Sequence, residues 1–286
     1  MSACHSGPVR LTTFINDGLR FDVLDEGPEE GPPVVLLHGF PQRAASWSQV
    51  ATRLHEEGFR TLAPDQRGYS PGARPRGRRS YAVPRLVGDV VALVDAADAG
   101  PVHLVGHDWG AAVAWAVAAQ HPELVRTLTT VSVPHPQAFV RSMLRGRQLL
   151  RSWYFLPFNV PGLVERLAAR APRRFAAALE GTGMTPATAE DVRTGVVEYG
   201  ALPGALSWYR ALPVSRPTAI GRVRVPTTHV WSTGDTALDR SGAEMTAAWV
   251  AAPYRLEVLD GVSHWVPELA PDALAAIIAD RARSAG

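Results

Sequence analysis

The sequence contains no lysine and a single cysteine. All 29 of its Lys and Arg positions are arginine, and 27 acidic residues leave a formal net charge of +2 at pH 7. A charge balance this small lacks the strong positive field of a typical nucleic-acid-binding protein, so we expect no nucleic-acid partner. Because Cys4 stands alone, the chain can build neither a disulfide framework nor a cysteine metal site.

Long apolar runs are also absent. The longest, such as residues 111–119, are far shorter than a membrane span, and residues 1–10 lack the apolar core of a secretory signal. We therefore expect no membrane partner and a cytoplasmic location. The length of 286 residues and the hydrophobic content of 46% suit one globular α/β domain with an insertion.

Short apolar strands alternate with helical periodicity along most of the chain. Strands are expected at residues 11–15, 19–24, 34–37, 59–63, 102–105, 128–133, 227–231 and 255–259. Helices are expected at residues 46–57 with Ser46 as the cap, at 81–97, 109–120 and 243–251, and from residue 271, with a loop at 71–80. This alternation predicts a mostly parallel central sheet flanked by helices, with catalytic groups beyond the carboxyl ends of its strands.

The pattern changes between residues 134 and 226. This stretch has helical periodicity, is rich in arginine and aromatic residues, and is broken by prolines. We interpret it as a helical cap inserted into a core domain that residues 1–133 and 227–286 form together. Its arginines are interpreted as a solvated helix face.

The most informative segment is Gly106-His107-Asp108-Trp109-Gly110, between an apolar strand and a helix of small residues. This is the layout of a nucleophile elbow, with aspartate in the position of the usual serine. A carboxylate is already anionic at neutral pH and can displace a leaving group at a saturated carbon, leaving an ester on the enzyme. The alternative interpretation of Asp108 is a helix N-cap, but the flanking glycines favour a nucleophile.

His264 follows the last predicted strand, so nucleophile, acid and histidine occur in the chain order typical of this elbow. This histidine could activate water against an aspartyl ester. We favour Asp235 as the acid that orients it, with Asp239 as the alternative. The backbone N–H groups of Trp109 and Phe40 are the expected oxyanion hole.

Together these segments resemble the α/β-hydrolase fold and, within it, the epoxide hydrolase family. The resemblance covers most of the chain and rests on the Asp108 elbow, His38-Gly39-Phe40-Pro41, Asp65-Gln66-Arg67-Gly68-Tyr69-Ser70 and Ser263-His264-Trp265. It implies a cis peptide bond between Phe40 and Pro41. It also implies two cap tyrosines that bind and protonate the epoxide oxygen, and the matching positions are Tyr154 and Tyr209. The segment around Tyr154 departs from the family pattern at Pro157 and Asn159.

The resemblance implies that a small apolar epoxide and water are converted to a vicinal diol through an aspartyl ester, with no metal or organic cofactor. Five side chains are expected to contact the substrate, namely Phe40, Trp109, Trp153, Trp208 and Trp265. The oligomeric state is not readable from the sequence.

Three other interpretations stay open. Haloalkane dehalogenases share the aspartate elbow, but they usually carry Asn as a second halide donor where this chain has Phe40. Fluoroacetate dehalogenases place Arg after the nucleophile, where this chain has Trp109. A non-catalytic ligand-binding protein on the same fold would not need Asp108, Asp235 and His264 together.

Overall fold

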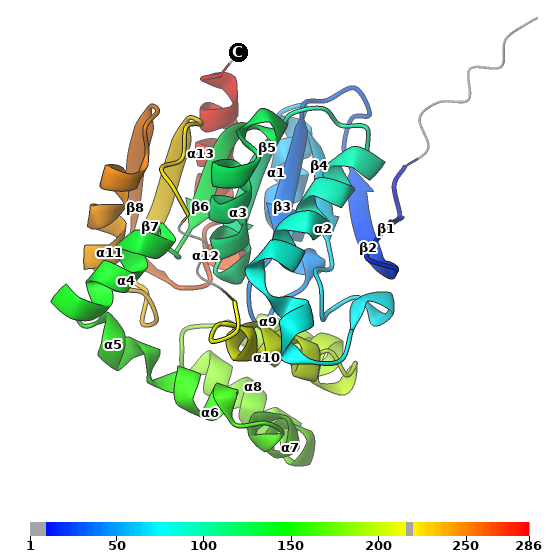
Figure 1. Cartoon of the computed structure of the whole chain (residues 1–286), viewed down its shortest axis with the longest axis vertical. Helices are drawn as coiled ribbons and strands as arrows, with labels where there is room; N and C mark the ends of the chain where they lie inside the picture. Colours follow the sequence, from blue (N-terminus) through cyan, green and yellow to red (C-terminus); the bar gives the residue numbers. More distant parts are fainter. Residues whose placement is uncertain (1–9, 216–219, 286) are drawn as a thin grey trace, which may run out of the picture.

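The computed structural model of the chain describes residues 10–215 and 220–285, and Cys4 lies outside them. Within this part of the chain, eight strands form one sheet in the order β1-β2-β4-β3-β5-β6-β7-β8 (Figure 1). The pairs β1–β2 and β2–β4 are antiparallel and the other five pairs are parallel, which confirms the predicted mostly parallel sheet. The strands are β1 (Thr13–Asn16), β2 (Leu19–Glu26), β3 (Pro33–Leu37), β4 (Arg60–Pro64), β5 (Val102–His107), β6 (Val125–Val131), β7 (Thr227–Gly234) and β8 (Tyr254–Ser263).

The central strands are apolar on both sides because helices cover both faces of the sheet. Strand β3 shows this alternation: Val35 and Leu37 belong to one hydrophobic core, and Val34 and Leu36 belong to the other. Helices α2 (Val83–Ala96) and α3 (Trp109–Gln120) contribute to the first core. Helices α1 (Ser48–Glu56) and α13 (Pro271–Arg283) contribute to the second.

The strand order reverses direction next to β3, and this reversal positions the site. Strand β4 pairs with one edge of β3, and β5 pairs with the other. The chains that leave β3 and β5 therefore diverge at their carboxyl ends, where open α/β sheets place their ligand crevices. Phe40 follows β3 and Asp108 follows β5, so both lie at this point.

The segment between β6 and β7 is helical, as predicted. In Figure 1 its helices lie below the carboxyl ends of the strands, away from α13 and the C-terminus. The segment consists of α4 (Pro136–Arg145), α5 (Gln148–Arg151), α6 (Phe155–Asn159), α7 (Leu163–Arg170), α8 (Pro172–Glu180), α9 (Pro186–Val192), a π-helical turn (Arg193–Glu198) and α10 (Leu202–Ala211).

Three local predictions are wrong. Ser46 caps no helix: it lies inside a 3-10 turn (Ala44–Trp47), and the Asp65 carboxylate accepts the hydrogen bond of the turn's first N–H instead. The helix expected at residues 243–251 begins earlier, as α11 (Arg240–Met245), because Asp239 provides its cap, and it ends in a 3-10 turn (Thr246–Trp249). The expected loop at 71–80 contains two 3-10 turns, Pro71–Ala73 and Arg78–Tyr81.

Candidate active site

The turn from β5 into α3 holds Asp108 in a left-handed backbone conformation, with φ of +51°. Two glycines make the turn possible by allowing close backbone approach. A Cβ atom on Gly106 would lie 2.3 Å from the carbonyl oxygen of Gly110, and a Cβ atom on Gly110 would lie 2.1 Å from that of Leu37. The Asp108 side chain makes no capping hydrogen bond to α3, so the N-cap interpretation does not describe it.

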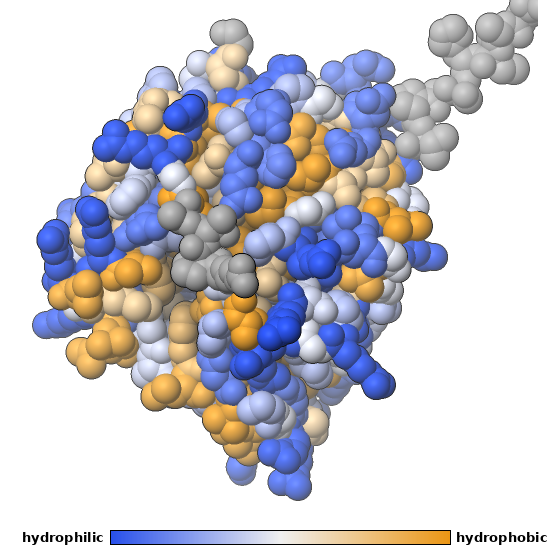
Figure 2. Space-filling model, viewed as in Figure 1, coloured by the Kyte–Doolittle hydropathy of each residue, from blue (hydrophilic) through white to orange (hydrophobic). Residues whose placement is uncertain are grey.

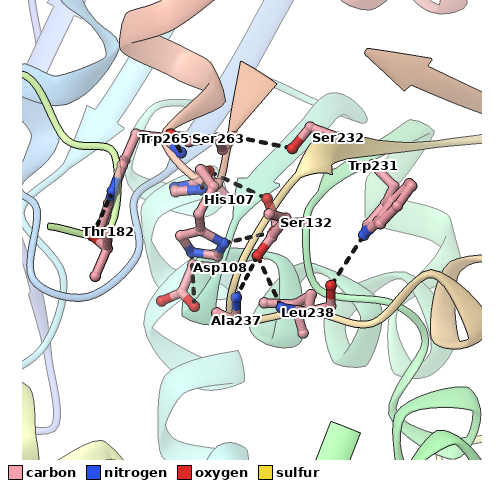
Figure 3. A network of polar contacts seen from close by, with 12 residues as sticks. His107, Asp108, Ser132, Thr182, Trp231, Ser232, Ala237, Leu238, Ser263 and Trp265 are labelled. Atoms are coloured by element: carbon pink, nitrogen blue, oxygen red, sulfur yellow. Dashed lines mark hydrogen bonds and ion pairs between the residues drawn. The ribbon is translucent and has the colours of Figure 1, made fainter. Parts of the chain in front are cut away.

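Figure 3 shows Asp108 within a polar network that includes His107, Ser232 and Ser263. The two carboxylate oxygens of Asp108 have different neighbours. Oδ1 accepts a hydrogen bond from the backbone N–H of Phe40 at 2.8 Å. Oδ2 lies 3.6 Å from Nε2 of His264. The Phe40–Pro41 peptide bond is cis, as the family resemblance implied. Trp109 opens α3, and the first N–H groups of a helix have no partner within the helix.

His264 lies between two aspartates. Its Nδ1 is 2.8 Å from Oδ2 of Asp235, while the other oxygen of Asp235 accepts hydrogen bonds from the N–H groups of Ala237 and Leu238, each at 2.8 Å. Asp239 instead caps α11 by accepting from the Ser241 N–H at 3.0 Å. The structure therefore brings Asp235, and not Asp239, to His264.

The pKa values of these three groups shift together. Burial lowers the pKa of His264, but the charges of Asp235 and Asp108 and the hydrogen bonds to them outweigh burial and raise it to about 10. Burial raises the pKa of Asp108, yet the hydrogen bond and charge of His264 leave it below its usual value. Burial also raises the pKa of Asp235, but the charge of His264 and the hydrogen bond to it lower that pKa below its usual value. The direction of all three shifts favours a charged His264 between two carboxylates.

An apolar cavity of about 400 Å³ opens above Asp108. Asp108, Trp109, Tyr154 and Tyr209 all line it, so the structure brings both predicted tyrosines to the same cavity as Asp108. The ring centroids of the two tyrosines are 6.1 Å apart, with the rings nearly perpendicular. Further wall residues come from the helical segment and from the chain around it, including Phe139, Val140, Met143, Phe155, Leu212 and Leu238.

Burial sets the state of both phenols. It raises the pKa of Tyr154 and of Tyr209 far above the usual value, and the negative charge of Asp108 adds to the shift. Tyr209 is 3% exposed, and its ring is edge-on to Phe40 at 5.3 Å and to Trp109 at 5.1 Å. Both hydroxyls therefore stay protonated and can donate hydrogen bonds into the cavity.

Four of the five residues expected to touch substrate are not among the cavity-lining residues. Trp153 is 68% exposed, because it precedes Tyr154 in a 3-10 turn (Ser152–Tyr154) where consecutive side chains point in different directions. Trp208 lies behind Trp109, with its Nε1 donating to the Arg67 carbonyl at 2.7 Å. Trp265 donates to the Thr182 hydroxyl at 3.0 Å, and Phe40 packs behind Tyr209. Trp109 alone of the five reaches the cavity wall.

Several residues near the site were missed by the sequence analysis. His107 is buried beside His264, with ring centroids 4.9 Å apart, and burial lowers its pKa to about 4. Arg151 of α5 donates to the carbonyl oxygens of Asp235 and Leu238, which ties the helical segment to the loop that holds the acid. The position of His107 inside the elbow could have indicated that it lies near the site, but no local sequence pattern indicates Arg151.

A second cavity, of about 640 Å³, lies beside the site and has a more polar wall. Gln42 and Glu268 line it and are hydrogen-bonded to each other. Burial raises the pKa of Glu268 to about 8. One buried side-chain oxygen of Gln42, one of Glu268 and the hydroxyl of Ser46 have no partner among the described residues.

Comparisons with known proteins show the family of this chain. The α/β-hydrolase fold family matches residues 32–271. The chain is 31% identical to mouse "Epoxide hydrolase 4" over 274 residues, covering 92% of this chain and 76% of that protein. It is 30% identical to "Epoxide hydrolase A" of Mycobacterium tuberculosis over 304 residues, covering 92% and 94% of the two chains.

Solved structures give the same result. Epoxide hydrolase A from Mycobacterium thermoresistibile superposes with a TM-score of 0.84 at 26% identity, over 97% of this chain and 98% of that one. Potato epoxide hydrolase I superposes with a TM-score of 0.78 at 26% identity, over 95% and 98%. The chain belongs to the α/β-hydrolase fold family and, within that family, to the epoxide hydrolases.

Proposed function

We propose that the protein hydrolyses a small apolar epoxide to a vicinal diol through an ester on Asp108. The observation that carries this proposal is the position of the Asp108 carboxylate. One of its oxygens is held by the Phe40 N–H, and Asp108 itself lines an apolar cavity together with two protonated tyrosines. A carboxylate nucleophile facing two phenols suits a substrate whose leaving group is an alkoxide.

In the first step, Oδ2 of Asp108 attacks one carbon of the epoxide ring. A C–O ester bond forms, and the C–O bond of the ring breaks with its electron pair on oxygen. Tyr154 and Tyr209 donate hydrogen bonds to that oxygen, and one of them gives it a proton. We assign the proton that restores the phenol to the imidazolium of His264, so the step ends with a hydroxyalkyl ester and a neutral histidine.

In the second step, His264 acts as the base. Neutral His264, oriented by Asp235, takes a proton from a water molecule, and the hydroxide attacks the ester carbonyl carbon of Asp108. Oδ1 becomes the oxyanion, and the Phe40 N–H already donates to this atom in the resting structure. The Trp109 N–H is the second proposed donor. The intermediate then breaks the bond between its acyl carbon and the alcohol oxygen, and that oxygen takes the remaining proton of the attacking water. Diol leaves, Asp108 is again a carboxylate, and His264 keeps the proton it took, which restores the starting state.

Loss of the negative charge on Asp108 sets the order of the two steps. The resting pKa of His264, about 10, depends on two flanking carboxylates. Formation of the ester removes the negative charge of Asp108, and the burial of the ring then opposes protonation more effectively. The histidine consequently becomes a base after the ester has formed. Residues 134–226 act in this proposal as a cap that supplies both phenols and excludes water from the first step.

The experiment that tests the proposal is intact-protein mass spectrometry of His264→Gln. This variant should form the ester but should not hydrolyse it. After exposure to a panel of epoxides, we expect a mass gain equal to a whole epoxide, mapped to Asp108 by peptide sequencing. His264→Gln combined with Asp108→Asn is the matched control and should gain no mass.

The same experiment decides against the alternative chemistry. A haloalkane dehalogenase would instead gain the mass of a haloalkane minus hydrogen halide. Phe40 offers no side-chain donor for a halide, so we expect no such adduct. A haloalkane adduct without any epoxide adduct would overturn the proposal, and a failure of both panels would favour a binding protein.

A further inference from the structure

The exposed apolar side chains of this protein are concentrated on one part of its surface. Of the 14 large hydrophobic residues that are exposed in the described part of the chain, eight fall within residues 140–167. Figure 2 shows apolar colour over the region of α4 to α6, at the lower left of the molecule. We name six of these residues, 58% to 85% exposed, the leucine face: Leu144, Leu149, Leu150, Trp153, Leu156 and Leu167. Apolar patches of this kind on a soluble domain mark interaction sites.

Arginines border the leucine face. On α4, exposed Leu144 is followed by exposed Arg145, and on α7, exposed Leu167 lies between exposed Arg166 and Arg170. Residues 134–180 contain eight arginines and two glutamates, a net charge of +6 in a chain whose total is +2. Seven of these arginines are exposed and form no ion pair among the described residues, namely Arg141, Arg145, Arg147, Arg166, Arg170, Arg173 and Arg174.

We propose that the leucine face binds an anionic lipid surface. Apolar side chains next to arginines on short amphipathic helices are the combination that inserts at the boundary between headgroups and acyl chains. The charge argues against a second copy of the chain, because two faces of net +6 would repel each other. It also argues against a nucleic acid, because six bulky apolar residues would face a polar backbone.

The apolar cavity lies close behind this face. Val140 on α4 is 56% exposed and also lines the cavity, one helical turn before Leu144. An apolar ligand dissolved in the membrane would thus meet the cavity wall without crossing water. The lipid-binding inference rests on the surface alone and stands whether or not the ligand is an epoxide.

A surface-bound protein needs no membrane span. No described helix is long and apolar enough to cross a bilayer, and the sequence analysis expected no membrane partner for a related reason. The apolar runs of the sequence are too short to span a bilayer. The leucine face arises instead from residues spaced along several short helices and turned to one side by the tertiary structure.

The test is flotation of the full chain with phospholipid vesicles. Vesicles of phosphatidylcholine alone are compared with vesicles that contain about 30% phosphatidylglycerol, at low and at high salt. We expect binding to the anionic vesicles that high salt weakens. Trp153 emission should be quenched by brominated acyl chains, and Trp153→Phe should lose that part of the quenching.

Two sets of variants separate the apolar and the charged contribution. Leu144→Ser/Leu149→Ser/Leu150→Ser should lower vesicle partitioning by about tenfold or more. Arg145→Gln/Arg147→Gln/Arg170→Gln should lower it for anionic vesicles only. The matched controls lie elsewhere on the surface: Ile15→Ser for an exposed apolar residue, and Arg76→Gln/Arg78→Gln/Arg79→Gln for the same loss of charge. Neither control should change partitioning.

Clear outcomes would overturn the inference. A wild-type chain that fails to float with anionic vesicles would do so, as would a leucine variant that floats as well as wild type. Light scattering on the lipid-free protein supplies a third. If it shows a dimer that the leucine variant dissociates, the face is a contact between two copies of the chain.

Discussion

The sheet and the helical segment contribute to the site in different ways. Asp108, Asp235 and His264 lie at the ends of strands, are at most 8% exposed, and are held by backbone hydrogen bonds or by each other. Tyr154 ends a 3-10 turn between α5 and α6, whose leucines are exposed, and Tyr209 comes from the mostly buried helix α10. The sheet therefore fixes the charged groups, whose distances must be accurate, and the helices complete the cavity around them.

The two regions also differ in how burial acts on their ionisable groups. In the sheet, charged neighbours overcome burial and keep the three groups ionised. In the helical segment, no positively charged group counteracts the effect of burial on the pKa of Tyr154 or Tyr209, and the phenols stay neutral. In the proposed mechanism, one region supplies the nucleophile and the base, and the other supplies neutral hydrogen-bond donors.

The largest expected effect is that of Asp108→Asn. We expect diol formation to fall by at least about 10⁴-fold, because an amide cannot serve as the anionic nucleophile. The rate should be measured on freshly prepared protein, since slow deamidation of the new Asn would restore aspartate. Thermal unfolding of the same sample shows whether the fold persists. Diol formation near the wild-type rate would mean that another group forms the ester.

The same variant tests the electrostatic link within the sheet. Without the charge of Asp108, the pKa of His264 should fall from about 10 by at least about two units, because burial then meets one carboxylate instead of two. Nitrogen-15 NMR of labelled histidines measures this value, with His264→Gln identifying the signal. An unchanged pKa would show that Asp235 alone keeps His264 charged. It would contradict the proposal that His264 becomes a base when the ester forms.

Tyr154→Phe and Tyr209→Phe test the helical segment. Each should slow formation of the ester by about 10- to 100-fold, because each removes one hydrogen bond to the developing alkoxide. Single-turnover kinetics separates this step from hydrolysis of the ester, which should be nearly unchanged. Trp153→Phe, one position away but turned to solvent, is the control. Equal rates in the tyrosine variants and the control would show that other groups hold the oxygen.

The smallest expected effect concerns Glu268 and the pH dependence of stability. Burial raises the pKa of this group to about 8 in the folded protein, above its ordinary value of 4.5. The folded state therefore binds the proton more tightly, and this contribution to stability is lost as pH rises from about 5 through 8. Glu268→Gln should make unfolding by urea less sensitive to pH over this range, by about 1–3 kcal/mol.

An exposed acid provides the comparison for this measurement. Glu180→Gln removes a solvent-exposed carboxylate from the end of α8 and should leave the pH dependence as in wild type. If Glu268→Gln behaves in the same way, the carboxyl group is ionised in the folded protein and the polar cavity holds a charge.

Much of the fold could be predicted from local patterns. Continuous apolar runs such as residues 33–37 have the composition of strands buried on both faces, and the two glycines around Asp108 are required by the turn itself. Element boundaries were less predictable. Ser46 is a residue type typical of helix caps but lies inside a turn, and the carboxylate of Asp65, which follows β4, accepts the hydrogen bond of the turn's first N–H.

The sequence by itself determined the parallel sheet, the aspartate elbow and the chain order of the reacting groups, because periodicity and glycine geometry act over a few residues. The tertiary structure decided which acid meets His264. Asp235 and Asp239 are only four residues apart, but Asp235 follows β7, which pairs with the strand that precedes His264, whereas Asp239 caps α11. It also decided that Tyr154 turns inward while Trp153 and the leucine face turn outward. Side-chain direction on short helices depends on what packs against them, and that is fixed when distant segments meet.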